Sequence, residues 1–245
     1  MTGVRPGRRA SRARSSRTEE VQQQIKQLIL ERNLAVGDPM PTEFELVEEL
    51  DVSRNSLREA LKALQAVGIV DIKHGFGMYV GSMSLGALVD ELTFHARISR
   101  QKGHNDLAHL VEVREVLERG LIDEVIERGL ADETPELDEV MAQMEAEAAA
   151  GGVSPDTDRR FHELLYRPLA NPIVSQLLNA FWDVYNALRH DLAPAEESPM
   201  EIALRHREIY DALRAHDRPA AAVAMSAHFR GIHVRLARME ERSST

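Results

Sequence analysis

The sequence contains no cysteine, which excludes disulfides, thiolate metal ligands and cysteine nucleophiles and agrees with a reducing cytoplasm. Aromatic residues are scarce, at 4% of the chain, which favours helices packed through aliphatic side chains over a β-sandwich. No apolar run approaches the roughly 18 residues that a membrane helix needs. Polar residues follow the arginine pair Arg8-Arg9, which argues against export. The sequence therefore predicts a cytoplasmic protein without a membrane partner, large enough for one or two compact domains.

Charge is unevenly distributed along the chain. The formal net charge is −10, yet residues 1–17 contain six arginines and no acid, which leaves −16 for residues 18–245. A basic segment on an acidic body is typical of a nucleic-acid-binding arm, and a solvated N-terminus fits the same composition. We predict a disordered basic arm over residues 1–17, with its role left open.

Residues 18–81 carry the pattern of a small DNA-binding domain. Apolar residues recur at helical spacing from Val21, a capping box at Thr42 opens a second helix, and Ser53 is the expected N-cap of a third. Two short β-like runs within 69–80 flank a glycine-containing turn, which indicates a hairpin. Helix, helix, turn, helix and hairpin in this order predict a winged helix-turn-helix.

From residue 82 to residue 245 the pattern is helical, and we find no convincing strand. Gly and Pro clusters separate the apolar stripes, and the last four expected helices cover residues 156–169, 172–191, 198–215 and 218–240. This region predicts an antiparallel all-α bundle of six or seven helices. The fold class is therefore mainly α, with a winged helix-turn-helix at the N-terminus.

The third helix of the first domain is the expected DNA-reading element. In a helix-turn-helix the second helix of the motif lies in the major groove, with its N-terminal residues against base edges. Arg54 and Arg58 share one face, and their guanidinium groups suit guanine or phosphate. The other candidates for DNA contacts are Asn55 for adenine, Ser53, Ser56 and Thr42 for phosphate, and the wing-tip residues His74 and Gly75 for the minor groove. Because residues 18–81 have a net charge of −5, a protein-interaction module fits the pattern as well.

This region resembles the N-terminal domain of the GntR family of bacterial transcription regulators. The resemblance rests on segments 36–43 and 52–61 and on the Gly-x-Gly wing. It implies that Arg54 and Arg58 are the principal DNA contacts, assisted by residues of the third helix and the wing. Phe44 is a departure, because many members have a basic DNA-contacting residue there. Either that contact is missing or the operator differs, so Phe44 is not among the predicted DNA contacts.

A second constellation combines three histidines with one aspartate. Asp158 and His162 are four residues apart and project from one helix face. His206 and His228 lie 11 residues before and after Asp217, so an antiparallel hairpin about Asp217 would bring them level. Such nitrogen and oxygen ligands suit Zn²⁺, Ni²⁺ or Mn²⁺ with a position left open. Taken singly, each histidine fits a surface or a satisfied core residue.

The second region is similar to the effector domain of the FadR subfamily, often called the FCD domain. The resemblance rests on Asp158-x3-His162, on the residues around His206 and on Met225-x2-His228. Many members bind a metal through an Asp and three His at these places and set a small carboxylate ligand on it. The resemblance implies these four residues as metal ligands. It also implies Arg114 as an effector contact, with Asn171, Tyr185 and Arg189 as weaker candidates. Arg114 also fits a salt bridge with Glu118, and Asn171 equally fits a helix cap.

These observations predict a homodimeric transcription regulator that binds a palindromic DNA operator. Because regulators of this subfamily are usually repressors, repression is the expected direction. A small organic acid bound at a divalent metal, most simply zinc, would shift its operator affinity. A regulator with a purely structural metal is the first alternative. A metal-dependent hydrolase is the second, but no Glu or Asp has the spacing of a general base. We therefore predict no enzymatic activity.

Overall fold

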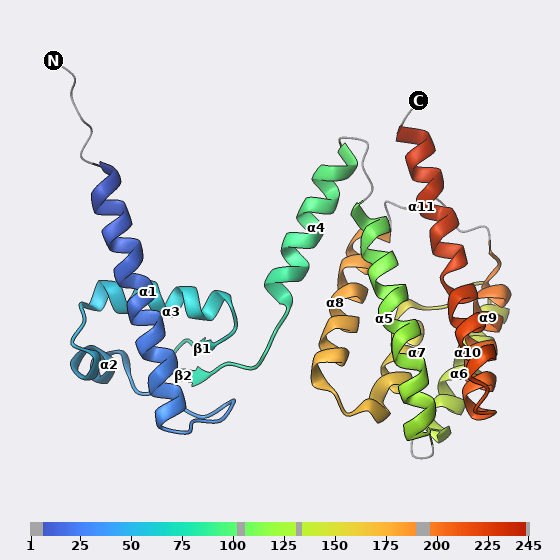
Figure 1. Cartoon of the computed structure of the whole chain (residues 1–245), viewed down its shortest axis with the longest axis horizontal. Helices are drawn as coiled ribbons and strands as arrows, with labels where there is room; N and C mark the ends of the chain where they lie inside the picture. Colours follow the sequence, from blue (N-terminus) through green and yellow to red (C-terminus); the bar gives the residue numbers. More distant parts are fainter. Residues whose placement is uncertain (1–6, 102–105, 131–133, 190–196, 244–245) are drawn as a thin grey trace. The chain divides into compact units, whose positions relative to one another are not determined.

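The computed structural model describes residues 7–101, 106–130, 134–189 and 197–243 (Figure 1). The chain divides into two compact units, Met1–Ala87 and Leu88–Thr245, each with its own hydrophobic core. The sequence predicts a boundary a few residues earlier, after Gly81. Among the described residues, no helix is both long and apolar enough to cross a membrane.

The first unit has the predicted order of helices and strands. Its elements are α1 (Gly7–Glu31), α2 (Glu43–Leu50), α3 (Arg54–Ala66), β1 (Val70–Lys73) and β2 (Gly77–Val80). The strands form an antiparallel hairpin in which Val70 pairs with Val80 and Lys73 with Gly77. The backbone N–H of Met40 donates to the carbonyl of Met78 at 2.8 Å, which ties the hairpin to the segment before α2. The hairpin is therefore a wing anchored to the helices.

Two side-chain caps start α2 and α3 where the sequence predicts them. Thr42 Oγ1 accepts from the Glu45 backbone N–H at 3.3 Å, and Glu45 Oε2 accepts from the Thr42 N–H at 2.7 Å. Ser53 Oγ accepts from the Ser56 N–H at 3.1 Å. Leu57 is buried on the inner face of α3, so the cap sets which side chains of this helix point outward.

The N-terminal arm differs from its prediction. Helix α1 begins at Gly7, so the backbone of residues 7–17 is helical where the sequence predicts disorder. Arginine and alanine are good helix formers, and no proline or glycine interrupts residues 8–31. Once the part of α1 that packs in the core has formed, the helix can therefore extend toward the N-terminus. Residues 1–6 of the predicted arm lie outside the described part of the chain.

The described part of the second unit holds eight α-helices and one short 3₁₀ helix, η1 (Arg167–Leu169). The α-helices are α4 (Gly86–Gln101), which begins just before the unit boundary, α5 (Asp106–Arg128), α6 (Thr134–Ala149), α7 (Pro155–Tyr166), α8 (Pro172–Leu188), α9 (Pro199–Arg214), α10 (Arg218–His228) and α11 (Arg230–Ser243). Helix α5 packs against α8, α10 and α11, and α9 packs against α6 and α10 (Figure 1). The predicted all-α bundle is confirmed.

One predicted helix is interrupted. The sequence predicts a single helix over 218–240, but α10 ends at His228 and α11 begins at Arg230. Phe229 between them is 2% exposed and belongs to the core of the bundle. Gly231 lies two residues further along the chain, and glycine weakens a helix by about 1 kcal/mol relative to alanine. Burial of the Phe229 ring beside a weak helix former accounts for the break.

Candidate DNA-binding surface and candidate metal centre

The outward face of α3 presents most of the predicted DNA contacts together. Ser53, Arg54, Asn55 and Arg58 are exposed, whereas Ser56 is half-buried. The hydroxyl of Ser56 lies 2.9 Å from that of Ser53. The first turns of α3 therefore offer two guanidinium groups, an amide and a hydroxyl to a common ligand.

Glu43 is a residue of this surface that the sequence analysis missed. Arg58 Nε donates to Glu43 Oε2 at 2.9 Å, and both side chains are exposed. This bond leaves the two terminal nitrogens of Arg58 available, so Glu43 orients the guanidinium without occupying its outer edge. The two residues are 15 positions apart and lie on different helices, so no helical spacing connects them.

The wing tip is held in a defined shape. Gly75 and Gly77 have φ angles of +80° and +110°, which L-residues with side chains rarely adopt, and Tyr79 Oη donates to the Phe76 carbonyl at 3.0 Å. His74 and Gly75 are exposed, as a DNA-contacting tip requires. Phe76 is 79% exposed and was not among the predicted contacts. Thr42 is exposed too, but its hydroxyl already donates to Glu45 Oε2 at 2.8 Å.

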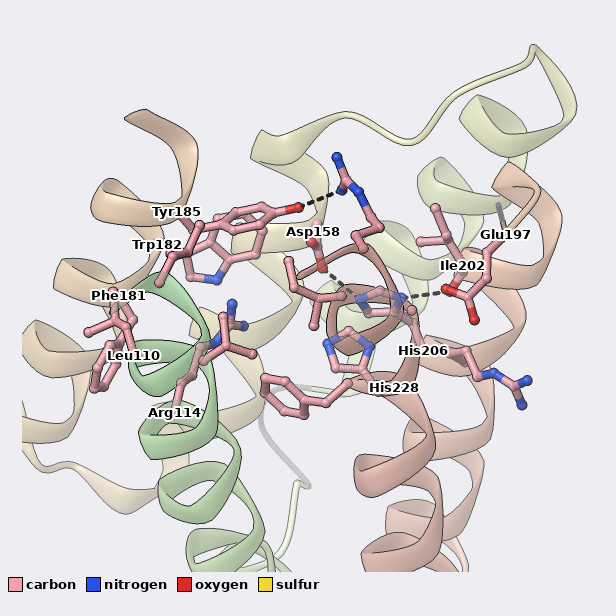
Figure 2. Close-up of a pocket in the computed structure, with 17 residues that line it drawn as sticks. Leu110, Arg114, Asp158, Phe181, Trp182, Tyr185, Glu197, Ile202, His206 and His228 are labelled. Carbon is pink, nitrogen blue, oxygen red and sulfur yellow. Dashed lines mark hydrogen bonds and ion pairs between the residues drawn. The ribbon is translucent and has the colours of Figure 1, made fainter. Parts of the chain in front are cut away.

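In the second unit the four predicted metal ligands converge. Asp158 and His162 come from α7, His206 from α9, and His228 from the end of α10. One ligand atom from each lies within 4.8 Å of those of the other three. Figure 2 shows Asp158, His206 and His228 facing one cavity. We call these residues the four-residue cluster.

The helical hairpin predicted about Asp217 is what brings two of the histidines level. Asp217 is the N-cap of α10, and its Oδ1 accepts from the Ala220 N–H at 2.9 Å. Helices α9 and α10 pack against each other on either side of it. The ring centres of His206 and His228 are 4.5 Å apart, so this part of the spacing argument is confirmed.

The backbone directs one nitrogen of His206 into the cluster. Its Nδ1 lies 2.8 Å from the carbonyl of Ile202, which can only accept, so Nδ1 carries the proton. Its Nε2 then faces Asp158 Oδ1 at 2.6 Å (Figure 2). A neutral imidazole presents a lone pair at Nε2, and that lone pair and the carboxylate repel each other unless a proton or a metal cation lies between them.

Glu118 on α5 gives His162 a similar orientation. Both ring nitrogens of His162 are buried, and neither makes a hydrogen bond of regular geometry. Nδ1 lies 2.7 Å from Glu118 Oε2, and Nε2 lies 3.6 Å from Asp158 Oδ1. A proton on Nδ1 that Glu118 accepts leaves a lone pair at Nε2 for the cluster. In metal sites, the ring nitrogen of a histidine that does not bind the metal commonly donates to a carboxylate, and this contact raises the basicity of the histidine.

Glu118 is fully buried and accepts from two further groups. Arg114 Nε donates to its Oε1 at 2.5 Å, and the hydroxyl of Tyr166 donates to its Oε2 at 3.1 Å. From the sequence, Glu118 is expected only as a salt-bridge partner of Arg114, and that bridge is present. Its contact with His162, far along the chain, had no signal in the sequence.

Electrostatics keep both carboxylates of the site ionised. Burial acts to raise the pKa of Glu118, but the charges of Arg114 and His162 outweigh it and the pKa falls well below its ordinary value. Burial also opposes ionisation of Asp158, but a positive charge on protonated His206, whose Nε2 faces this carboxylate, outweighs burial and lowers the pKa of Asp158 well below its ordinary value. The site therefore holds two carboxylate charges.

The histidines differ in their protonation. Burial lowers the pKa of His228 well below its ordinary value, and the charges of His206 and His162 lower it further, so His228 is neutral as a metal ligand must be. For His162, burial acts to lower the pKa, but the negative charge of the adjacent Glu118 carboxylate outweighs burial and raises it. In the absence of a cation, a proton on His162 balances part of the carboxylate charge.

A cavity opens beside the four-residue cluster, and we call it the central cavity. Arg114, Trp182 and Tyr185 line it together with Asp158 and other residues of α5, α8, α9 and α11 (Figure 2). The Arg114 guanidinium lies 4.9 Å from the centre of the Trp182 ring, and its Nη2 is buried without a hydrogen-bond partner. An unpaired buried guanidinium nitrogen beside a possible metal centre can receive an anion.

Comparison with known families agrees with this two-part architecture. Residues 17–80 match the model of the bacterial regulatory proteins of the gntR family, and residues 109–231 match the FCD domain. The second match alone covers half of the chain. The chain belongs to the GntR family of bacterial regulators, with an FCD domain in its C-terminal half.

Whole-length relatives support the same assignment. The chain is 28% identical over 229 residues to the HTH-type transcriptional repressor NanR of Edwardsiella tarda, which covers 92% of this chain and 87% of the relative. It is 26% identical to the HTH-type transcriptional regulator LutR of Bacillus subtilis, covering 84% and 94% of the two chains. A Streptococcus agalactiae GntR structure is similar with a TM-score of 0.62 and 26% identity, over 88% of this chain and 98% of that one.

This GntR family protein is thus a DNA-binding transcription regulator and not an enzyme, as the sequence predicts. The predicted DNA contacts, with Glu43, fall inside the matched gntR region. The four-residue cluster, Arg114 and Glu118 fall inside the matched FCD region. Both candidate sites therefore lie in the parts of the chain that define the family.

Two predicted effector contacts lie elsewhere than expected. Asn171 does not line the central cavity, because its Oδ1 caps α8 by accepting from the Ile173 N–H at 3.0 Å. Arg189 lines a neighbouring cavity, which shares Asp158 and Tyr185 with the central one. Of the three weaker candidates, only Tyr185 faces the central cavity.

We expect Asn171→Ala to act on stability alone. Loss of the cap should lower the free energy of unfolding by about 1 kcal/mol, measured by urea denaturation, and leave metal affinity unchanged within error. Asn171→Asp keeps an accepting oxygen and should recover most of the stability. A large loss of metal affinity in Asn171→Ala would return this residue to the candidate site.

Proposed function

We propose that this GntR family protein is a metal-dependent, effector-responsive repressor. A divalent cation held by the four-residue cluster would bind a small organic acid in the central cavity and thereby shift operator affinity. The observation that carries the proposal is the convergence of four ligand atoms within 4.8 Å of one another, beside a cavity lined by Arg114. The relatives named as transcriptional repressors support the direction of regulation.

The donor set suits a divalent transition metal. Two ligands bound at 2.0–2.2 Å from one ion stand roughly 3–4 Å apart, so small side-chain rotations bring all four donors into range. Three imidazoles and one carboxylate suit Zn²⁺ best and also Ni²⁺ and Mn²⁺. The lone pair of His206 Nε2 facing a carboxylate, and the unpartnered Nε2 of His162, are the features that a cation would satisfy.

Arg114 is the residue that we assign to the carboxylate of the effector. Its Nε is committed to Glu118, and its Nη2 is buried without a partner. When bound, the metal would supply Lewis-acid attraction for a carboxylate oxygen, and Arg114 would add a charge-assisted hydrogen bond. Tyr185 closes another part of the cavity wall.

The acid-binding part of the proposal is tested by thermal unfolding of the full chain. Protein stripped with a chelator is reloaded with Zn²⁺, Ni²⁺ or Mn²⁺, and C3–C6 hydroxy, keto and sugar acids are added. We expect at least one acid to raise the melting temperature only when metal is present, because metal and acid share one site. Equal stabilisation of metal-free protein would contradict the shared site, and no response to any acid would leave the metal with a structural role.

For the first unit we propose that Arg54 and Arg58 read an operator from the major groove, with Ser53, Asn55, Ser56 and Thr42 on the phosphates or bases. His74 and Gly75 would enter the minor groove. The protein would act in the cytoplasm as a homodimer, since two copies of one reading helix match a palindromic operator. The exposure of Arg54, Asn55 and Arg58 on α3, and of His74 and Gly75 on the wing, supports this assignment.

Arg58→Ala is expected to weaken binding to an operator, selected by the protein from a random duplex pool, by about 1–3 kcal/mol. The loss should be concentrated at one base position, because a guanidinium fork reads a guanine edge. Fluorescence anisotropy with single-base operator variants measures both effects. Arg32→Ala removes the same charge after α1 and should cost less, without base preference. Unchanged affinity in Arg58→Ala would remove this residue from the DNA site.

A further inference from the structure

We propose that Glu197 recognises a hydrogen-bond donor on the effector, so that the effector is a hydroxy or amino acid with that donor remote from the carboxylate. The inference rests on the proposed acid-binding role of the central cavity and narrows the class of acid. Glu197 is an acidic side chain of that cavity, and it is neither a predicted metal ligand nor a predicted effector contact.

Glu197 lies directly before Ser198, the N-cap of α9, and lines the central cavity. Figure 2 shows it on the opposite side of His206 and His228 from Arg114. An acid whose carboxylate is held near Arg114 and the metal would therefore extend past the histidines toward Glu197.

A glycine makes the room for this carboxylate. Gly231 is in α11, and a Cβ atom added to it would lie 1.8 Å from Glu197 Oε2 and 2.7 Å from Glu197 Cδ. Any other residue at 231 would push the Glu197 carboxylate from its position. Since glycine within a helix costs about 1 kcal/mol relative to alanine, the space at 231 is kept at some expense of helix stability.

Among the described residues, the Glu197 carboxylate has no hydrogen-bond donor. Within the described ranges, no residue makes a hydrogen bond or ion pair with Glu197. The neighbouring Arg205, which also lines the cavity, pairs instead with Glu208 at 3.2 Å. Glu197 is half-buried, and an ionised carboxylate only accepts hydrogen bonds, so an effector group that replaces water on it must be a donor.

The rest of the cavity limits what that donor is attached to. Leu107, Leu110, Val111 and Phe181 form an apolar wall near Arg114. Ile202, Phe229 and Ile232 line the cavity as well, so a carbon chain that runs from Arg114 past the histidines to Glu197 can contact apolar side chains. A hydroxyl and an ammonium group both donate to a carboxylate, whereas a second carboxylate would be repelled by Glu197. Arg205 and Arg235 line the same cavity, so the preference concerns the position that Glu197 faces. At that position the geometry favours a hydroxyl or ammonium group over a second carboxylate.

Matched acids test this preference on the zinc-loaded full chain by isothermal titration calorimetry. The C4 series is butanoate, 4-hydroxybutanoate, 4-aminobutanoate and succinate, with the C5 and C6 analogues beside it to allow for span. In the wild type we expect the best donor-bearing acid to bind about tenfold or more tighter than the alkanoate of equal length, as a hydrogen bond to a charged group implies. Succinate and its longer analogues should gain nothing.

Two substitutions distinguish the hydrogen-bond-accepting role of Glu197 from the effect of its negative charge. Glu197→Ala should abolish the preference for hydroxy and amino acids and leave alkanoate affinity unchanged. Glu197→Gln should keep the preference for the hydroxy acid, because an amide oxygen still accepts, and lose most of the preference for the ammonium group.

Gly231→Ala displaces the same carboxylate without altering Glu197 and should reproduce the loss of preference. Gly120→Ala in α5 is the matched control, since a Cβ there meets no atom within 4 Å, and it should change nothing. A donor preference that survives both Glu197→Ala and Gly231→Ala, or a wild type without such preference, overturns the inference while acid binding stands. Failure of every acid to bind the metal-loaded wild type overturns the proposed effector role itself.

Discussion

Replacing Glu118 with alanine is expected to lower the free energy of unfolding of the second unit by about 3–5 kcal/mol. The substitution leaves the Arg114 guanidinium buried without its carboxylate, and it removes an acceptor from His162 and from Tyr166. An uncompensated buried charge is among the most destabilising changes known for single residues. Urea unfolding of the full chain, followed by circular dichroism, measures the shift in midpoint.

Glu124→Ala is the matched control for that experiment. Glu124 is also a glutamate of α5 and pairs with Arg128 at 2.9 Å, but both side chains are about half exposed. An exposed pair contributes about 0–1 kcal/mol, so this variant should unfold near the wild-type midpoint. Equal losses of unfolding free energy in the two variants would mean that the buried Glu118 network stabilises the protein no more than an exposed ion pair does.

His206→Ala is expected to remove the metal. The wild type should bind one divalent ion per chain, and a metal concentration of 100 times the dissociation constant should stabilise it by about 2.7 kcal/mol. The variant lacks the ligand that joins α9 to the cluster, so we expect neither stoichiometric metal nor metal-dependent stabilisation. Elemental analysis after dialysis and thermal unfolding with and without added Zn²⁺ measure the two effects.

A second histidine substitution checks that the effect is specific. His109 is exposed on α5 and is not part of the four-residue cluster, so His109→Ala should keep its metal and its metal-dependent stability. The winged helix should remain folded in His206→Ala, because its core belongs to a different unit. Full metal content in His206→Ala would contradict the proposed ligand set.

Local signals predicted much of this structure. Thr42 and Ser53 cap helices where their sequence context places the caps, because a cap depends only on residues three positions away. The convergence of His206 and His228 followed from one turn at Asp217 and a constant rise per residue. Neither inference needed knowledge of contacts between distant parts of the chain.

Contacts between distant residues were the ones that sequence could not predict. Glu118 meets His162, and Glu43 meets Arg58, only because separate helices pack together. Glu197 enters the central cavity because Gly231 on another helix leaves space for it. At Asn171 the sequence left two roles open, because an amide that caps its own helix looks the same in sequence as one that lines a cavity, and the structure shows the cap.

The central claim is that metal and acid act together on DNA binding, and operator affinity under four conditions tests it. The dissociation constant for a selected operator is measured by anisotropy for chelator-stripped and zinc-loaded full chain, each with and without the acid that best stabilises the loaded protein. We predict that the acid weakens operator binding by roughly 5–150-fold in the zinc-loaded protein, the usual range for coupling between two sites, and has no effect on the stripped protein. An equal effect of the acid in both forms, or none in the loaded form, would contradict the account.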